Sequence, residues 1–435
     1  MRKTAYLLGV VLVIFATGFS RAAVAGGMAK ENAELRQKVD QLDKELEELK
    51  KIVVQQTGAT GDTLPKPVWS NLDIQLYGYL KLDSAYDSSR TDNGNYAKWV
   101  DSESTNDNDD QFNMTTNQTR LGMLINGPDN GSMKTSGRVE LDFYGGGDEN
   151  KSRLMMRHAY FKMDWPDKRF NIIAGQTTDV ISPLFPSTVN YSVGWWTGNI
   201  GYRRPQLRFT KEMSINDNVD LKLEGALART IGRNDAVAAP NGTESGEDKG
   251  FPSLQGRVSM TLPLYKQKMA TIGFSGHWGE EEYDLNVVGN NKEFKTWSLN
   301  MDFEQPINNK LAIKGEIFTG ENLDAYLGGI GQGVITDTTK TVYYKEIGSS
   351  GGWIAASLGP WNNKRFNIGI ASDDADSSDI NMGDRTLNRS VFGNMYYALN
   401  KQTDVAFELS HWRTEYKGSG DGDSLRAQLA LIYKF

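Results

Sequence analysis

An all-β fold, a transmembrane antiparallel β-barrel of about 16 strands with a short N-terminal α-helical coiled coil, is predicted by three features of this 435-residue chain. Residues 72–435 contain repeated stretches in which apolar and polar residues alternate, and period two is typical of strands with one apolar face. Clusters of Gly, Asn, Asp and Pro separate these stretches, as turns do. The last eleven residues alternate strictly and end on Phe435, which is how bacterial outer-membrane barrels end.

The composition agrees with export to the Gram-negative outer membrane. The chain has no Cys, which suits passage through an oxidising periplasm and excludes a lipoprotein anchor. Its mean hydropathy of -0.52 is low for a membrane protein. That value does not argue against a barrel, because a barrel strand turns only every second residue toward lipid.

The N-terminal segment, residues 1–25, is predicted to be a signal peptide. Arg2 and Lys3 precede an apolar core over Ala5–Phe19, and Ala23-Val24-Ala25 matches the small-residue cleavage pattern. An uncleaved anchor helix is the alternative. The apolar core is too short for a stable membrane span, so we expect Gly26 to begin the mature chain.

Residues 26–54 are predicted to form a periplasmic coiled coil that joins chains. Apolar residues recur there at alternating spacings of four and three, between charged and polar residues. So short a coil is marginal alone and gains stability when something else already holds the chains together. β-Branched residues alternating with Leu favour a dimer, but many outer-membrane barrels assemble as trimers, so the number of chains stays open. A single amphipathic helix on the barrel mouth is the alternative. The seam consists of Leu35, Val39, Leu42, Leu46, Leu49 and Val53.

Residues 55–71, with two Gly and two Pro, are predicted to be a linker, and residues 72–435 the outer-membrane barrel. In the first strand, 73–86, Ile74 and Leu80 alternate with Lys81 and Asp83. An even strand count returns the C-terminus to the periplasmic side, where the barrel begins. The other strands are expected near 119–127, 137–143, 153–165, 169–176, 204–212, 219–230, 253–262, 267–278, 293–304, 310–319, 352–358, 364–372, 389–399, 403–413 and 425–435.

Long polar insertions at 90–114, 236–250 and 373–384 are predicted to be extracellular loops. Their acidic clusters have no EF-hand pattern, so solvated loops are favoured over divalent-cation sites that also hold lipid phosphates. Three aromatic pairs fit either membrane-interface girdles or core packing. These pairs are Trp195-Trp196, Tyr343-Tyr344 and Tyr396-Tyr397.

Catalysis, metal binding and nucleic-acid binding are not indicated. The three His lack metal-ligand spacing, and no phosphate loop, dinucleotide motif or basic run is present. Ser275 and His277 would share a strand face, but no third group orients them as a lipid hydrolase requires. We therefore expect no catalytic residue, no metal and no cofactor.

Charged residues in the alternating stretches are predicted to line the lumen. A charge facing lipid near its midplane would cost roughly 2–4 kcal/mol. Arginine suits carboxylate solutes because its planar fork binds both oxygens, and a ring of arginines would concentrate anions. The alternative is a wall whose opposite charges cancel. The residues are Lys81, Arg138, Glu140, Asp142, Arg203, Arg204 and Arg208.

The stretch between Gly175 and Gly201 is too long for a turn, is apolar and contains two Pro. It falls at about the fifth-to-sixth strand connection, where porins have a loop that folds inward and sets the bore. An apolar loop is disfavoured in water, so we expect this one to enter the barrel.

Several motifs resemble the DcaP-like trimeric porins: YGYLKLDSAY at 77–86, GRVELDFYGG at 137–146, RHAYFKMDW at 157–165, AGQTTDVISPLFP at 174–186 and NIGYRRPQLR at 199–208. The resemblance is strongest over about 72–210. It implies a trimer of sixteen-stranded barrels, each with its own pore, joined by periplasmic helices. It also implies a preference for anionic solutes, notably dicarboxylates, and makes Arg138, Arg157, Arg203, Arg204 and Arg208 candidate pore residues.

The leading hypothesis is thus a passive outer-membrane porin. A structural or envelope-tethering protein that uses the coiled coil to bind a partner is the alternative, and a surface lipid hydrolase using Ser275 is a third. The expected partners are the lipid bilayer, lipopolysaccharide, two further copies of the chain, and the barrel assembly machinery, which would recognise the strand ending at Phe435.

Overall fold

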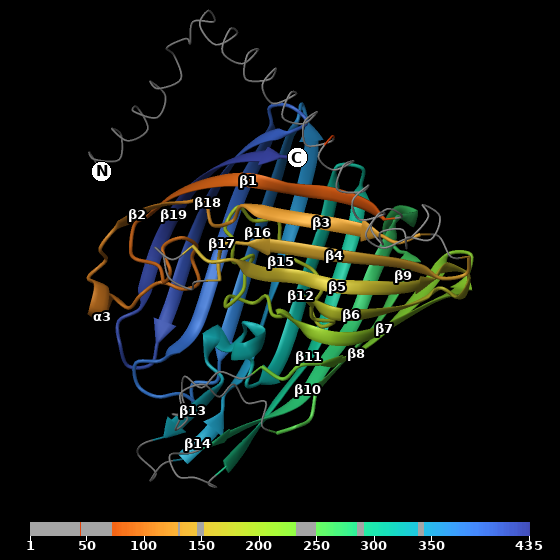
Figure 1. Ribbon diagram of the computed structural model, residues 1–435. Coiled ribbons are helices and arrows are strands. Elements are labelled where there is room, and N and C mark those ends of the chain that lie inside the picture. Colours follow the sequence, from red (N-terminus) through yellow and green to blue (C-terminus); the bar gives the residue numbers. More distant parts are fainter. Residues whose placement is uncertain are drawn as a thin grey trace, which may run out of the picture. The chain divides into compact units, whose positions relative to one another are not determined.

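Strands that pair only with antiparallel neighbours close into a barrel in the computed structural model (Figure 1). The structure describes Lys44 and residues 72–128, 131–145, 152–231, 249–284, 291–337 and 343–435. The predicted signal peptide, coiled coil and linker therefore lie outside the described residues, Lys44 excepted. Within the described ranges, no helix is long and apolar enough to cross a membrane.

Seventeen described strands form the main sheet, and two short ones form a separate hairpin. The hairpin strands are β13 (Val334–Asp337) and β14 (Tyr343–Glu346). The barrel strands are β1 (Asp73–Asp87), β2 (Gln111–Thr115), β3 (Arg120–Asn126), β4 (Lys134–Asp142), β5 (Met155–Trp165), β6 (Phe170–Thr178), β7 (Arg203–Asn216), β8 (Val219–Ala228), β9 (Ser253–Pro263), β10 (Met269–Asp284), β11 (Asn291–Asn308), β12 (Leu311–Glu321), β15 (Gly348–Trp361), β16 (Lys364–Ala375), β17 (Arg385–Ala398), β18 (Thr403–Tyr416) and β19 (Gly422–Lys434).

The first and last strands close the barrel. β1 pairs with β19 from Tyr79 opposite Lys434 to Asp87 opposite Arg426. On its other side, β1 pairs first with β3 and then with β2, so these two short strands share one position in the ring. The barrel thus has sixteen strand positions, and the predicted fold class is confirmed for this part of the chain.

Connections differ in length between the two ends of the barrel. The four longest, residues 88–110, 179–202, 229–252 and 322–347, lie at one end, and the opposite end has turns as short as residues 309–310. Short helical turns occur in both sets. They are α3 (Glu103–Asn106), η2 (Pro166–Lys168), η3 (Tyr265–Gln267), η4 (Asp324–Tyr326) and η5 (Gly329–Gly331). The two ends therefore differ as the long-loop and short-turn ends of transmembrane β-barrels do.

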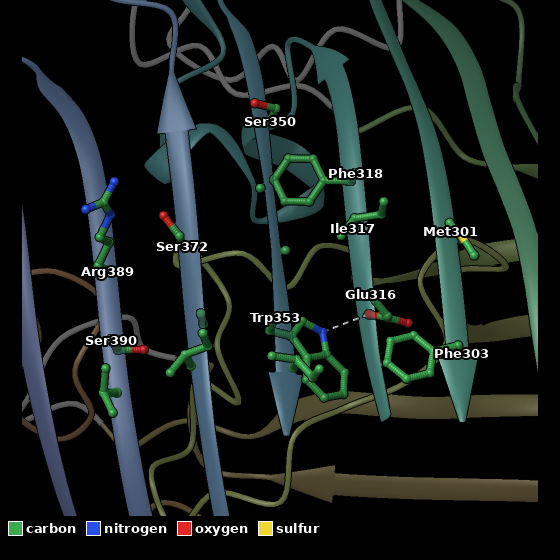
Figure 2. A pocket seen from close by; sticks show the side chains of 16 residues that line it. Met301, Phe303, Glu316, Ile317, Phe318, Ser350, Trp353, Ser372, Arg389 and Ser390 are labelled. Atoms are coloured by element: carbon green, nitrogen blue, oxygen red, sulfur yellow. Dashed lines mark hydrogen bonds between the residues drawn. The ribbon is translucent and has the colours of Figure 1, made fainter. Parts of the chain in front are cut away.

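Side chains alternate between the two faces of the wall, as the period-two pattern predicts. On β1, Leu76 is 74% exposed on the outer face, whereas Lys81 on the inner face is 5% exposed. On β12, buried Glu316 and Phe318 flank exposed Ile317 (Figure 2). The polar residues of the strands therefore line the interior, and the apolar ones form the outer surface.

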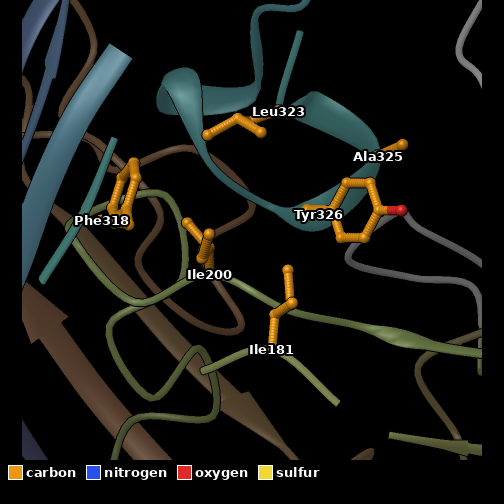
Figure 3. Close-up of a cluster of buried hydrophobic side chains, with 6 residues drawn as sticks. All are labelled: Ile181, Ile200, Phe318, Leu323, Ala325 and Tyr326. Atoms are coloured by element: carbon orange, nitrogen blue, oxygen red, sulfur yellow. The ribbon is translucent and has the colours of Figure 1, made fainter. Parts of the chain in front are cut away.

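Two of the long connections meet inside the barrel: residues 179–202, and residues 322–331, which precede the β13–β14 hairpin. Ile181 and Ile200 from the first meet Leu323 and Tyr326 from the second, against Phe318 of β12 (Figure 3). Backbone hydrogen bonds join them as well, from Gly201 N to Tyr326 O at 2.7 Å. We call residues 179–202 the inward loop. Its entry into the barrel, expected from its apolar sequence, is confirmed by this burial.

The connection at 88–110 also turns inward in part. Tyr96, Ala97 and Val100 are buried, with Val100 against Trp412 of β18. The prediction of a solvated polar loop at 90–114 is thus wrong for these residues, and Gln111–Thr115 form β2. At 373–384, Asp373 is fully buried on β16, and the connection begins only at Asp376. Residues 232–248 lie outside the described part.

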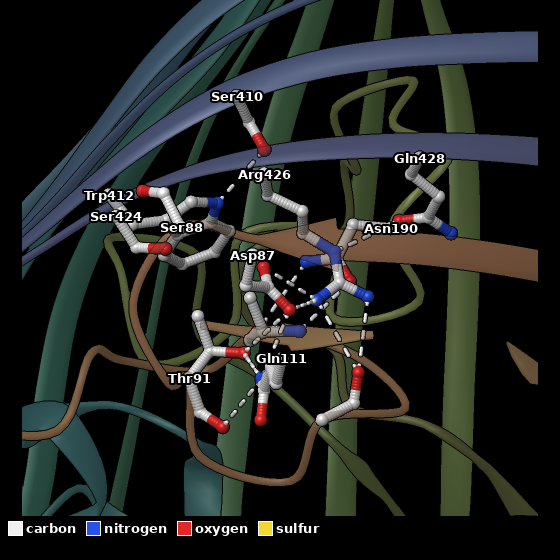
Figure 4. A network of polar contacts seen from close by, with 12 residues as sticks. Asp87, Ser88, Thr91, Gln111, Asn190, Ser410, Trp412, Ser424, Arg426 and Gln428 are labelled. Atoms are coloured by element: carbon white, nitrogen blue, oxygen red, sulfur yellow. Dashed lines mark hydrogen bonds and ion pairs between the residues drawn. The ribbon is translucent and has the colours of Figure 1, made fainter. Parts of the chain in front are cut away.

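A fully buried ion pair lies where β1 meets β19. Arg426 Nη1 donates to Asp87 Oδ2 at 2.7 Å, and neither side chain is exposed (Figure 4). Gln111 of β2 also donates to Asp87, at 3.0 Å. Because Asp87 and Arg426 are paired residues of the first and last strands, this contact fastens the closure of the barrel.

Candidate functional site

The predicted charged residues of β4 and β5 form one cluster on the inner wall. Glu140 is its centre: it accepts hydrogen bonds from Arg138 Nη2 at 2.6 Å, Arg157 Nε at 2.7 Å and the Tyr77 hydroxyl at 2.8 Å. Arg120 Nε lies 3.5 Å from the same carboxylate. Three arginines thus surround one buried carboxylate, so these four side chains together have a net positive charge.

Arg157 links this cluster to the inward loop. Its Nη1 donates to Asp142 Oδ2 at 2.7 Å, and the Tyr191 hydroxyl donates to the same oxygen at 3.2 Å. Burial raises the pKa of Tyr191, so its phenol stays protonated and serves as a donor. Arg157 and Asp142 are both buried, whereas the Arg138 side chain is 31% exposed. Arg138 is therefore the more accessible of the two arginines.

Arg203, at the start of β7, differs from the other arginines. Its side chain is 3% exposed and lies over the rings of Trp195 and Tyr202, at 5.3 and 5.2 Å. Its Nε and Nη2 are buried without a hydrogen-bond partner among the described residues. Buried donors are nearly always satisfied, so this guanidinium has capacity for an acceptor that the described protein does not supply.

Arg204 and Arg208 lie on the inner face of β7, as predicted, but both are engaged. Arg204 Nε forms an ion pair with Asp179 at 2.8 Å, Nη2 donates to Ala325 O at 3.1 Å, and the group lies 3.9 Å from the Tyr326 ring. Arg208 donates to Gln206 at 3.0 Å and to the carbonyl oxygen of Thr178. Arg204 thus binds both the inward loop and the segment around Ala325. Its guanidinium is buried and paired with Asp179.

Lys81 also supports the inward loop. Its Nζ lies 3.1 Å from Asp83 and donates to the Val189 carbonyl oxygen at 3.0 Å. All eight predicted lumen residues are therefore on one side of the ring, on β1, β4, β5 and β7. The structure joins Arg138, Glu140, Asp142 and Arg157 in one cluster. It places Lys81, Arg203 and Arg204 against the inward loop, and Arg208 beside Gln206 and Thr178.

Two buried carboxylates that sequence reasoning missed hold the far side of the inward loop. Glu408 of β18 accepts hydrogen bonds from Val189 N at 2.6 Å and Asn190 N at 3.2 Å. Glu316 of β12 accepts from Leu184 N at 2.7 Å. The loop is thus fixed to strands on both sides of the lumen. The only sign of these two residues in the sequence was their place in the alternating pattern, which put both side chains on the inner face of their strands.

Close backbone approach helps seat the loop. Gly198 has φ +114°, and a Cβ there would lie 2.3 Å from the Gly352 carbonyl oxygen of β15. Asn388 of β17 donates to Trp196 O at 2.8 Å and to Lys98 O at 2.7 Å. The inward loop is therefore attached to the connection at 88–110 as well as to the wall.

The aromatic pairs have different environments. Trp195 and Trp196 are buried with Tyr96 and Tyr191, so they are core and not girdle residues. Tyr396 faces inward and donates to Thr188 O at 2.8 Å, whereas Tyr397 is partly exposed on the outer face. The side chains of the third pair, at 343–344, lie outside the described part.

Ser275 and His277 share the inner face of β10, where both are buried. The His277 ring nitrogens contact Ser298 Oγ at 2.7 Å and Thr296 Oγ1 at 2.9 Å, and neither contacts Ser275. A surface lipid hydrolase requires its serine on the outer wall, so this geometry removes that hypothesis. In the described ranges, no three potential metal-ligating side chains gather.

Comparisons with known proteins agree with the barrel. Residues 31–240 match the DcaP outer membrane protein family. The outer membrane channel DcaP of Acinetobacter baumannii is similar in structure, with TM-score 0.65 and 19% identity over 84% of this chain and 98% of that one. An anion-selective porin from Comamonas acidovorans has TM-score 0.51 and 12% identity, over 84% of this chain and 100% of that one.

No curated protein sequence matches the chain. At these identities the two solved structures show the fold alone, so the family match is the finding that bears on the kind of protein. The predicted resemblance is therefore confirmed: residues 31–240 match the DcaP outer membrane proteins, and the described barrel has the fold of an outer-membrane porin.

Proposed function

We propose that this porin passes small hydrophilic solutes by passive diffusion and favours anionic ones such as dicarboxylates. The observation that carries the preference is an excess of arginine on one side of the lumen. Of the six arginines there, four contact carboxylates, and those four share only Glu140, Asp142 and Asp179. The arginines are Arg120, Arg138, Arg157, Arg203, Arg204 and Arg208.

The mechanism needs binding that is favourable yet brief. A guanidinium pairs with a solute carboxylate through two parallel hydrogen bonds, and nearby protein carboxylates keep that pairing weak enough for release. Arg203 has unpartnered donors beside the inward loop, and Arg138 is partly exposed below it. Glu316 and Glu408 lie across the lumen, where both are buried and accept hydrogen bonds from backbone amides of the inward loop.

The inward loop would set the width of the path. Below it, a hollow of about 420 Å³ reaches from Ser187 to the short-turn end of the barrel and is lined by Lys310, Arg365 and Tyr396. These two cations lie at the periplasmic mouth. We infer that a dicarboxylate leaving the arginine side meets positive charge again there.

Ion selectivity tests this proposal. A charge 10 Å from an ion in water changes the energy of that ion by about 0.4 kcal/mol, and salt at about 0.1 M reduces this to about 0.15 kcal/mol. Because the sign is opposite for anion and cation, each charge changes the anion-to-cation ratio about twofold. Replacing Arg138 and Arg208 together with Gln should therefore lower the anion-to-cation permeability ratio about fourfold, read from the reversal potential in a salt gradient. Arg389→Gln, on the outer face, is the control because it removes the same charge outside the lumen. An unchanged ratio in the double variant would refute the anion preference.

We further propose that the protein is a homotrimer whose coils, residues 26–54, join in the periplasm, and that the barrel assembly machinery recognises the β19 end. The heptad seam supports association of the chains, and the resemblance to the DcaP-like trimeric porins supports three of them. The strictly alternating strand ending at Phe435 supports the second proposal, and Phe435 N donates to Gly78 O of β1 at 3.1 Å. Envelope tethering through the coil is the alternative function that the same seam favours.

A further inference from the structure

A groove of about 800 Å³ crosses the outer wall of the barrel over β11, β12, β15, β16 and β17 (Figure 2). Its exposed apolar lining consists of outward side chains, which face the lipid in a membrane barrel. These are Ile317, Ile354, Ile370 and Val391. The groove is therefore a depression in the lipid-facing surface and not part of the lumen.

Small residues form the floor of this groove. Gly352 on β15 lies between Ile317 and Ile354, and a Cβ on it would come within 2.5 Å of the Glu316 carbonyl oxygen. Ser350 and Ser372 occupy the outward positions nearer the long-loop end. The depression is thus apolar toward the membrane centre and polar toward the long-loop end.

Arg389 stands at the polar end of the groove. It is the residue paired with Ser372 across β16 and β17, it is exposed, and its guanidinium points toward the end at which β16 finishes (Figure 2). Among the described residues, none forms a hydrogen bond or ion pair with it. The carboxylate of Asp374 is near enough to interact electrostatically without such contact.

The next arginine on the outer wall provides a comparison. Arg413 of β18 is paired directly with Arg389 across the strands. Arg413 is satisfied by the protein, since Nη2 lies 2.7 Å from Asp421 and Nε 3.4 Å from Glu415. Like charges on directly paired residues destabilise a sheet. Arg389 has no anion in direct contact among the described residues, so an external anion that pairs with it would reduce this cost.

We propose that the groove binds a lipid of the extracellular leaflet that has a phosphorylated headgroup. One acyl chain lies along Ile317, Ile354, Ile370 and Val391, and the phosphate pairs with Arg389. The guanidinium fork matches two phosphate oxygens, and the long-loop end of an outer-membrane barrel lies in the extracellular leaflet. This site is separate from the lumen and does not depend on solute selectivity.

The neighbouring charges limit where the phosphate can lie. A second, polar hollow beyond Ser350 contains Glu321, Asp374 and Asp376. These carboxylates would repel a phosphate placed there. The headgroup is thus expected to contact Arg389 from the Ser372 side, with its chain directed toward the short-turn end.

The test uses the full chain in nanodiscs of phosphatidylethanolamine with a small fraction of phosphorylated lipid A, and native mass spectrometry counts the lipid A that stays bound. Arg389→Gln removes the phosphate contact, and Ser372→Phe fills the groove. Arg413→Gln is the matched control, because it removes the same charge from the paired position. Lipid A without phosphates is the second probe.

We expect Arg389→Gln to weaken retention of phosphorylated lipid A about tenfold, which corresponds to about 1.4 kcal/mol. Ser372→Phe should reduce it as well, and Arg413→Gln should not. Retention in Arg389→Gln equal to that of the parent overturns the proposal, and so does equal retention of the two lipids by the parent protein. A change in oligomeric state with Ser372→Phe would overturn it too, because a second copy of the chain would then cover the groove.

Two controls separate these outcomes from misfolding of a variant and from loss of the pore. Heat-dependent gel mobility reports whether each variant still forms the closed barrel. Conductance of Arg389→Gln should equal that of the parent, since its side chain is outside the lumen. A folded variant that conducts normally but loses lipid A supports the lipid site whatever the solute preference is.

Discussion

Individual charged residues on the inner wall differ in whether their side chains are bound to the inward loop or remain partly exposed in the lumen. Arg204 and Lys81 were predicted from strand parity to face the lumen, and they do, but each is bound to the inward loop. The position of a residue in the alternating pattern of a strand specifies which face its side chain occupies, because side chains alternate with period two. It does not specify the partner, because Asp179 and Val189 come from a loop without a repeating pattern. Arg138, which is partly exposed, is the better candidate for solute contact.

The buried pair at the barrel closure gives a prediction at this scale. Arg426→Leu leaves the Asp87 carboxylate buried without its cation, and breaking such a pair costs about 3–5 kcal/mol. We expect a lower urea midpoint for loss of the heat-resistant gel mobility of the folded barrel. Asp87→Asn combined with Arg426→Leu should recover part of that loss. If both variants lose equal stability, the pair is not what fastens β1 to β19.

At the scale of elements, the strands were predictable, and of the inward-turning loops only the one at 179–202 was. All sixteen expected strands overlap described ones within a few residues, because alternation persists over each. β2 was missed because it is short and follows an acidic run. The inward course of 88–110 was missed because Tyr96, Ala97 and Val100 are buried by contacts with distant residues, among them Asn190 and Trp412. Only the apolar composition of 179–202 indicated burial.

The attachment of the inward loop gives the prediction for this scale. Glu408→Ala leaves the amides of Val189 and Asn190 buried without acceptors, at about 1–3 kcal/mol for each. We expect a looser loop, seen as faster proteolysis within 184–192 and a larger, noisier single-channel conductance. Asp404→Ala is the control, because Asp404 shares the strand and face of Glu408 but pairs with Lys434. Equal conductance in the two variants would mean that Glu408 does not hold the loop.

The whole molecule combines a wall that faces lipid with an interior that faces water. Its sixteen strand positions, its long connections at one end and the family match over residues 31–240 identify an outer-membrane porin fold. The excess of arginine on β3 to β7 and the inward loop across the lumen support selective diffusion of anions. The heptad pattern of residues 26–54 predicts that such barrels associate, and the family resemblance predicts that three of them do so.

Planar-bilayer recording of the purified full chain in a salt gradient, before and after addition of succinate, tests the central claim most directly. A porin that favours dicarboxylates should give conductance steps in groups of three, a reversal potential on the anion side, and a fall in chloride current as succinate occupies the lumen. Absence of conductance from protein whose gel mobility shows a folded barrel would contradict the account and favour envelope tethering.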